Sequence, residues 1–182
     1  MNTTPYNIAV GGSLRVEYAG INNGPVRVVT TTSGATILAT MRVLWGAGYD
    51  ELMGYPADQL TNEYVFPLYS NISLGTQLRV GNTGGVAANV DVYLGSTKLN
   101  SSQYNIPVGG SLRLDYANFE GGPLRVVTNT SGASILVTER IIYGSSGYDE
   151  LMGYPVAQLT TEYLFPWYNN KAMRSEIAIG VP

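Results

Sequence analysis

Apolar and polar residues alternate in several short runs along this chain, a spacing of two residues that predicts β-strands. The run from Ser13 to Tyr18 follows this pattern, and so does the run from Asn89 to Leu94. Each run places one set of side chains in a core and the other in water. Breaks rich in Gly, Ser, Thr and Asn separate the runs, such as TTSG before Ala35 and NTSG before Ala133. We interpret these breaks as hairpin turns.

The chain repeats itself. GYDELMGYP occurs at Gly48 to Pro56 and again at Gly147 to Pro155, and the segments around both copies match as well. The two copies are offset by 98 residues, and by 99 after one extra serine near Ser146, with more than half of the aligned positions identical. The sequence therefore predicts tandem copies of one unit of about 100 residues, a size typical of an immunoglobulin-like β-sandwich.

Only the middle of the chain contains a whole unit. We predict seven strands there, at residues 63–67, 76–82, 88–95, 104–108, 111–116, 123–128 and 134–143. The residues before it repeat only the last four strands, at 6–10, 13–18, 25–30 and 36–45. The residues after it repeat the first two, at 162–166 and 175–179.

These patterns predict an all-β protein of two tandem immunoglobulin-like β-sandwich units, the first of them incomplete. Residues 1–61 form the incomplete unit, residues 62–146 the complete unit, and residues 147–182 a joint followed by strands of the donor type. An unpaired strand edge presents unsatisfied amide and carbonyl groups, so the C-terminal strands are the natural complement of the N-terminal unit.

Three arrangements are open: the C-terminal strands add to their own N-terminal unit, they add to that of the next molecule, or the chain is a piece of a longer array whose ends carry no meaning. The second arrangement is head-to-tail and generates a filament. The predicted assembly interface consists of Glu162, Tyr163, Phe165, Trp167, Ile177 and Ile179.

GYDELMGYP is interpreted as the joint between consecutive units, with glycine and proline shaping the corner. After its last proline, one helical turn is predicted through Ala57 to Leu60 and again through Val156 to Leu159. The predicted joint residues are Tyr49, Leu52, Met53, Tyr55, Pro56, Tyr148, Leu151, Met152, Tyr154 and Pro155.

Composition narrows the classes of function. Apolar residues make up 45% of the 182 residues and charged residues 13%, which suits a folded β-protein with a neutral polar surface. Cysteine and histidine are absent, so thiolate chemistry, the usual general base and the commonest zinc ligand are missing. The net charge is −3 with scattered basic residues, which argues against nucleic-acid binding. No apolar run approaches the length of roughly 20 residues that a membrane span needs.

Paired acids are the remaining candidates for chemistry. Asp50-Glu51 and Asp149-Glu150 supply too few oxygen ligands for Ca²⁺. Glu63 and Glu162 precede aromatic strands, and we expect them to pair with a repeated arginine such as Arg42 or Arg140 rather than to cleave glycosides. We therefore expect no catalytic residue, no metal site and no cofactor.

The order GPVRVVT, TILATMRVLWG, ELMGYP and QLTTEYLFPWYNN, followed by SEIAIG, resembles a tandem repeat of uncharacterised bacterial cell-surface and secreted proteins. The resemblance covers nearly the whole chain and implies an extracellular location and a tandem architecture. The first copy departs from the pattern, because Leu68 stands where the second copy has Trp167.

From these observations we expect a non-enzymatic, extracellular structural protein that assembles with itself, head-to-tail, by β-strand addition. The alternative is an adhesive or carbohydrate-binding surface module from a longer array, which would use exposed tyrosines and tryptophans to bind a cell-surface polysaccharide.

Overall fold

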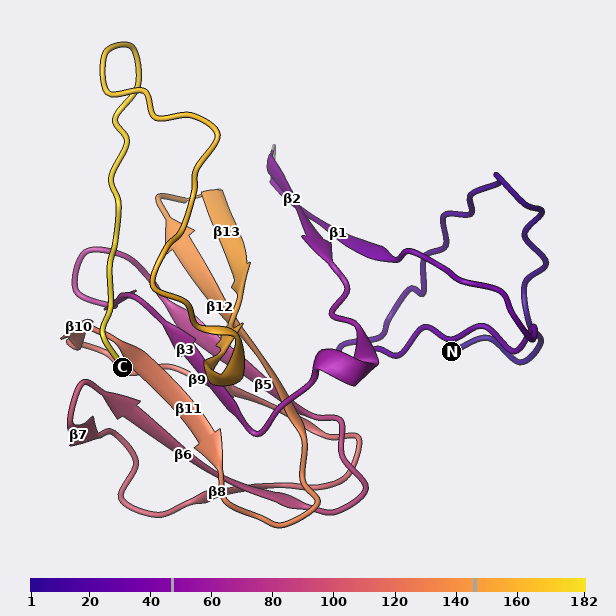
Figure 1. The fold of residues 1–182 in the computed structure, drawn as a ribbon, viewed down its shortest axis with the longest axis horizontal. Helices are drawn as coiled ribbons and strands as arrows, with labels where there is room; N and C mark the ends of the chain where they lie inside the picture. The colour runs from indigo at the N-terminus through magenta and orange to yellow at the C-terminus, as the bar shows by residue number, and fades with distance from the viewer. Residues whose placement is uncertain (47, 146) are drawn as a thin grey trace.

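The computed structural model describes residues 1–46, 48–145 and 147–182, and the extra serine near Ser146 lies outside the described residues. The protein is all-β, with strands that pair in antiparallel sheets (Figure 1). In the part of the chain that the structure describes, the helical elements are two single turns, η1 (Ala57–Gln59) and η2 (Val156–Gln158). Both follow the proline of GYDELMGYP, as predicted.

The larger sheet has six strands, in the order β14-β3-β11-β6-β7, with β8 also paired to β6. Its central strand β11 has β3 on one side and β6 on the other, so Leu124 lies between Phe66 and Leu94. The strands are β3 (Glu63–Phe66), β6 (Ala88–Leu94), β7 (Thr97–Lys98), β8 (Tyr104–Ile106), β11 (Leu124–Thr128) and β14 (Tyr154–Pro155).

The smaller sheet has four strands in the order β13-β12-β5-β9. Its longest strand, β12, places Arg140 opposite Gln77 on one side and opposite Glu150 on the other. The strands are β5 (Gln77–Asn82), β9 (Ser111–Leu114), β12 (Ile135–Tyr143) and β13 (Gly147–Met152). A short pair, β4 (Tyr69–Ser70) with β10 (Glu120–Gly121), accompanies the two sheets.

The core of the protein lies between these two sheets, within residues 63–155, which we call the middle unit. Along β5, Leu78 and Val80 are fully buried, whereas Gln77 and Arg79 on the opposite face are partly exposed. This alternation is the one that the sequence pattern predicts. The other core residues are Tyr64, Phe66, Tyr69, Ala88, Val90, Val92, Ile106, Leu114, Tyr116, Leu124, Val126, Ile135 and Val137.

All seven strands predicted within the middle unit are present, and their ends agree with the prediction to within two residues. The NTSG segment does form a turn, in which the Ala133 amide donates to the Thr130 carbonyl at 3.1 Å. The prediction of a hairpin there is wrong, however, because this turn carries the chain from β11 in the larger sheet to β12 in the smaller one.

GYDELM is a strand in both copies rather than a corner. The second copy is β13, which forms a hairpin with β12, and the first copy is β2 (Gly48–Met53), which forms a hairpin with β1 (Thr40–Trp45). The corner comes immediately afterwards, at Gly153, where the chain passes from β13 to β14 in the other sheet. A Cβ atom at Gly153 would lie 3.0 Å from both Phe66 and Tyr64, so any larger residue at this crossing would have to displace these core side chains.

The strands predicted at 6–10, 13–18, 25–30, 162–166 and 175–179 are not formed in the described chain, and of 36–45 only the end is a strand. Figure 1 shows the N-terminal chain beside the sheets, and the C-terminal tail (residues 159–182) as a loop that stands away from them before it returns. The physical reason is that a strand needs a partner for its amide and carbonyl groups, and the edges predicted to pair with these segments are not adjacent to them.

Asn100 is a buried polar residue that ties β6 of the larger sheet to the loop after β7, and it generates the first prediction. Its Oδ1 accepts from the Val92 amide at 2.9 Å, and its Nδ2 donates to the carbonyls of Val90 and Ser102. Asn100→Ala should lower the free energy of unfolding by about 2–3 kcal/mol, because buried backbone groups lose their partners. Chemical denaturation measures this loss.

The matched control is Asn105→Ala, since the exposed Asn105 side chain has Asn89 as its one hydrogen-bond partner among the described residues. This variant should change the stability by less than about 0.5 kcal/mol. Equal losses in the two variants would contradict an anchoring role for Asn100.

Candidate functional site

Strands β3 and β5 supply much of the core of the middle unit. Phe66 on β3 is 2% exposed and Val80 on β5 is fully buried. Strand β3 is held against β11 by a ladder, and an ion pair at 2.9 Å joins Arg125 Nη1 to Glu63 Oε1 across the two strands. The middle unit thus shows what residues 63–82 contribute when their partners are present.

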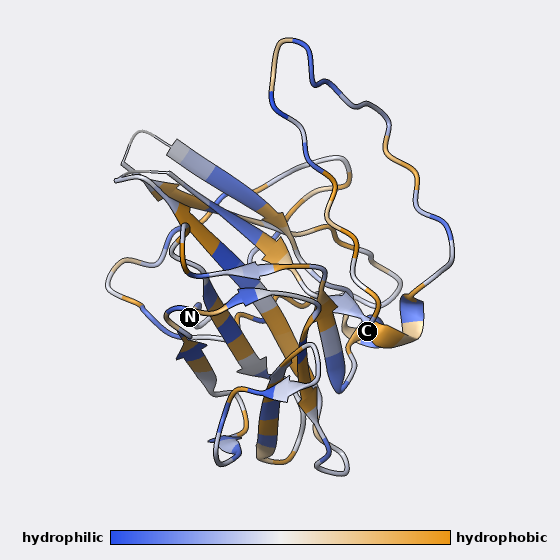
Figure 2. Cartoon of the chain, turned by 90° about the vertical axis from the view of Figure 1, so that its left-hand side faces the viewer, coloured by the Kyte–Doolittle hydropathy of each residue, from blue (hydrophilic) through white to orange (hydrophobic). Residues whose placement is uncertain are grey.

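The tail repeats residues 63–82 at an offset of 99, but its apolar side chains are exposed. Phe165 is 68% exposed, whereas its counterpart Phe66 is buried, and Ile179 is 84% exposed, whereas its counterpart Val80 is buried. Figure 2 shows apolar residues along this loop. All six predicted interface residues are exposed: Glu162, Tyr163, Phe165, Trp167, Ile177 and Ile179.

The N-terminal segment (residues 1–39) has the same property. Val26 is 53% exposed although its counterpart Leu124 is fully buried, and Ile37 is half exposed although its counterpart Ile135 is buried. Among the described residues, no strand pairing joins this segment to the tail. The end of the tail instead lies against the middle unit, where a Cβ atom at Gly180 would be 3.1 Å from atoms of Pro67 and Pro123.

The two GYDELM strands, β2 and β13, lie next to each other, which repetition alone does not predict. The Glu150 amide donates to Asp50 Oδ2 at 2.8 Å and to Asp149 Oδ1 at 3.0 Å, so a carboxylate from each copy meets at one amide. The Trp45 and Tyr148 rings pack with centroids 5.7 Å apart. The β1-β2 hairpin, which we call the first hairpin, is therefore fixed to β13 at the edge of the smaller sheet.

The ten residues predicted as a joint are divided between these strands and the crossing that follows. Leu52, Tyr148 and Pro155 are buried, and Tyr55 and Met152 are partly buried. The Tyr55 ring packs on Tyr64 at 6.2 Å, and the Tyr154 ring packs on the corresponding Tyr163 at 5.9 Å. The remaining members are exposed: Tyr49, Met53, Pro56, Leu151 and Tyr154.

The prediction that Glu63 forms an ion pair with an arginine such as Arg42 or Arg140 is wrong. Glu63 pairs with Arg125, whereas Arg140 pairs with Glu150 at 2.7 Å and Arg42 pairs with Glu51 at 2.8 Å. The reason is the register of the two hairpins, which places Arg42 directly opposite Glu51 and Arg140 directly opposite Glu150. A sequence interpretation that treats GYDELM as a corner cannot find this pair.

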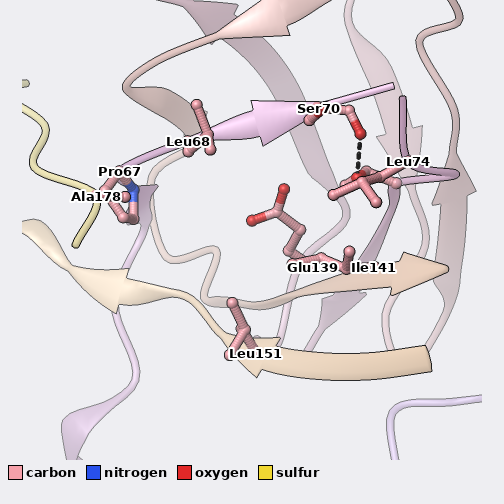
Figure 3. Close-up of a pocket in the computed structure, with 9 residues that line it drawn as sticks. Pro67, Leu68, Ser70, Leu74, Glu139, Ile141, Leu151 and Ala178 are labelled. Atoms are coloured by element: carbon pink, nitrogen blue, oxygen red, sulfur yellow. Dashed lines mark hydrogen bonds between the residues drawn. The ribbon is translucent and has the colours of Figure 1, made fainter. Parts of the chain in front are cut away.

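A pocket of about 160 Å³ lies at one end of the core, and the tail forms part of its wall (Figure 3). The carboxyl group of Glu139 on β12 points into it, and the surrounding residues are mostly apolar. They are Pro67, Leu68, Ser70, Leu74, Thr76, Ile141, Leu151 and Ala178. The tail residue Ala178 therefore lines the same pocket as a buried acid.

Glu139 is the functional candidate that sequence reasoning missed. It is 2% exposed, and burial alone raises the pKa of its carboxyl to about 8. One signal was present in the sequence: Glu139 aligns with Met41, so an acid replaces an apolar residue at a position that the alternation assigns to the core. Among the described residues, no group of three or more acids is placed to hold a metal ion.

Comparison with protein-family models, with curated proteins and with solved structures finds no match to this chain. The fold therefore defines the class, an all-β protein of antiparallel sheets. None of the helices in the described part of the chain is long and apolar enough to cross a membrane.

Glu139→Met tests the buried acid. The folded carboxyl keeps its proton up to pH about 8, whereas the unfolded one loses it near 4.5, so the folded protein binds more protons between these values. Wild-type stability should therefore fall as the pH rises from about 4.5 to 8 and then level off. Glu139→Met should remove this decline and be more stable at pH 8 by a few kcal/mol, since each pKa unit is worth about 1.4 kcal/mol.

Denaturant unfolding across this pH range provides the measurement. The control is Glu17→Met, which replaces an exposed acid of the N-terminal segment and should leave the pH dependence unchanged. If the stability of Glu139→Met fell with rising pH as much as that of the wild type, groups other than Glu139 would cause the pH dependence.

Proposed function

We propose that this protein is a non-enzymatic structural protein of the bacterial cell exterior that assembles head-to-tail into a filament or surface layer by donated β-strands. Two tandem immunoglobulin-like sandwich units would form the repeat of the assembly. The tail of each molecule completes the N-terminal unit of the next one, as β3 and β5 complete the middle unit.

One observation carries this proposal: the same residues that are buried in the middle unit are exposed in the tail and in the N-terminal segment. Large adjoining apolar surfaces on a soluble chain usually mark an interaction site. The two exposed sets are complementary, because the repeat relates one to β3 and β5 and the other to the strands that pair with them.

The register of the proposed contact follows from the repeat. In the middle unit Phe66 lies opposite Leu124, so Phe165 of one molecule would lie opposite Val26 of the next. The ion pair between Arg125 and Glu63 becomes one between Arg27 and Glu162. The second donated strand would place Ile179 opposite Ala39, as Val80 lies opposite Val137.

The location outside the cell is inferred from the composition and from the resemblance to bacterial surface repeats. The composition is rich in Thr, Ser, Asn and Gly and low in charge. Without cysteine or histidine, the chain lacks two residue types that often serve in catalytic sites. Protease treatment of intact cells of the source organism tests this location, because an exterior protein is cleaved and an interior one is protected.

The double variant Ile177→Asp, Ile179→Asp tests the donated strand. Burying two such side chains stabilises a contact by about 3–6 kcal/mol, so charging them should weaken the association at least a hundredfold. The variant should remain a folded monomer at concentrations where the wild type assembles. Sedimentation velocity over a concentration series measures the association, and circular dichroism checks the fold.

The control is Ile72→Asp, which charges an equally exposed isoleucine in the loop between β4 and β5. Ile72 aligns with Lys171, so the proposed contact does not need an apolar residue there, and this variant should assemble normally. A wild-type chain that stays monomeric at every concentration would refute assembly. A monomer in which the tail residues are protected from hydrogen exchange would show closure within one chain.

A further inference from the structure

Three arginines meet on the outer face of the smaller sheet, on the side opposite the core. Arg79 on β5 lies directly opposite Arg113 on β9, and Arg140 lies on the adjacent strand β12. They line a pocket of about 370 Å³ between this sheet and strand β1. A pocket of this size suits one small ligand, such as a single sugar residue.

The positive charge in this pocket is only partly balanced. Arg140 is paired with Glu150, but within the described residues Arg79 and Arg113 have no ion-pair partner. Like charges directly opposite each other on antiparallel strands are destabilising. Burial, and then the charges of Arg140 and Arg113, lower the pKa of the Arg79 guanidinium. An anion between the two free arginines would relieve this repulsion.

Two buried polar atoms at this pocket have no hydrogen-bond partner in the described structure. They are Arg79 Nη1 and the hydroxyl of Tyr148, whose side chain is 93% buried. The other terminal nitrogen of Arg79, Nη2, already donates to Gln77 Oε1 at 3.1 Å. An unsatisfied buried donor costs free energy, so Arg79 and Tyr148 bring unused hydrogen-bonding capacity to the lining of this pocket.

The opposite wall of the pocket is apolar and aromatic. It is formed by Val43, Leu44 and Trp45 of the first hairpin, and the Trp45 ring packs against Tyr148. A flat ring beside unpaired guanidinium groups fits a ligand that has an apolar face and a carboxylate. Guanidinium groups bind carboxylates through two parallel hydrogen bonds, and aromatic rings pack on the apolar face of a sugar.

We propose that this pocket binds the carboxylate of an acidic sugar, with Arg79 and Arg113 holding the carboxylate and Trp45 packing on the ring. The site rests on the contact between the first hairpin and the smaller sheet, and it does not depend on strand donation. Of the two copies, only the middle unit has all three arginines. Arg113 and Arg140 have counterparts in Arg15 and Arg42, but the counterpart of Arg79 is Ala178.

The test is titration of the full chain with galacturonate, followed by the fluorescence of Trp45 in a Trp167→Phe background. Galactose is the neutral control ligand, and a short polygalacturonate distinguishes a polymer-bound sugar acid from a free one. We expect saturable binding of galacturonate that weakens at high salt. Galactose should bind at least about tenfold more weakly, because it lacks the charge-assisted hydrogen bonds.

Arg79→Ala gives the pocket the residue that the tail has at this position, and it should weaken the binding of galacturonate at least about tenfold. The matched control is Arg15→Ala, which removes the counterpart of Arg113 and should bind as the wild type does. Circular dichroism and thermal unfolding show that both variants are folded. Absent binding of both galacturonate and polygalacturonate, equal binding of galactose, or unchanged binding in Arg79→Ala would each overturn the proposal.

Discussion

The structure depends on one constraint: a β-strand with an apolar face is stable only where a partner strand covers its edge and a second sheet covers its face. In the middle unit β3 and β5 meet this condition, and Phe66 and Leu78 are buried against β11 and β12. The same sequence pattern in the tail lacks both partners and forms no strand in the described chain. The repeated pattern therefore forms strands in the middle unit and not in the tail because of the neighbouring strands, and not because of local β-propensity.

Much of the middle unit could be predicted from the sequence, because its strands alternate cleanly and turn residues separate them. The sequence could not show which strands share a sheet. It predicts a hairpin at the turn before Ala133, whereas this turn joins the two sheets. It also could not show that GYDELM is paired, since the glycines and proline of GYDELMGYP are equally typical of a corner. Once β12 and β13 pair, their register places Arg140 opposite Glu150, and the two side chains form an ion pair at 2.7 Å.

The positions where the two copies differ are as informative as those where they agree. Glu139 replaces Met41 in the core, and Arg79 has alanine as its counterpart in the tail. Each introduces an ionisable group that the apolar pattern does not require, one inside the sandwich and one on its outer face. The residues that the copies share build the strands and the core of the middle unit, whereas Glu139 and Arg79 are polar groups that only the middle unit has.

The proposed head-to-tail contact is tested most directly by mixing two charge-reversed chains, Arg27→Glu and Glu162→Arg. In each variant alone the contact opposes like charges, and assembly should require a severalfold higher concentration, as for a loss of about 1 kcal/mol. In a mixture, each tail meets a head of opposite charge, so assembly should return to the level of the wild type in light scattering. A mixture that fails to assemble, with a double variant that stays monomeric but regains the stability lost in each single variant, would contradict the account, because it would place the contact within one chain.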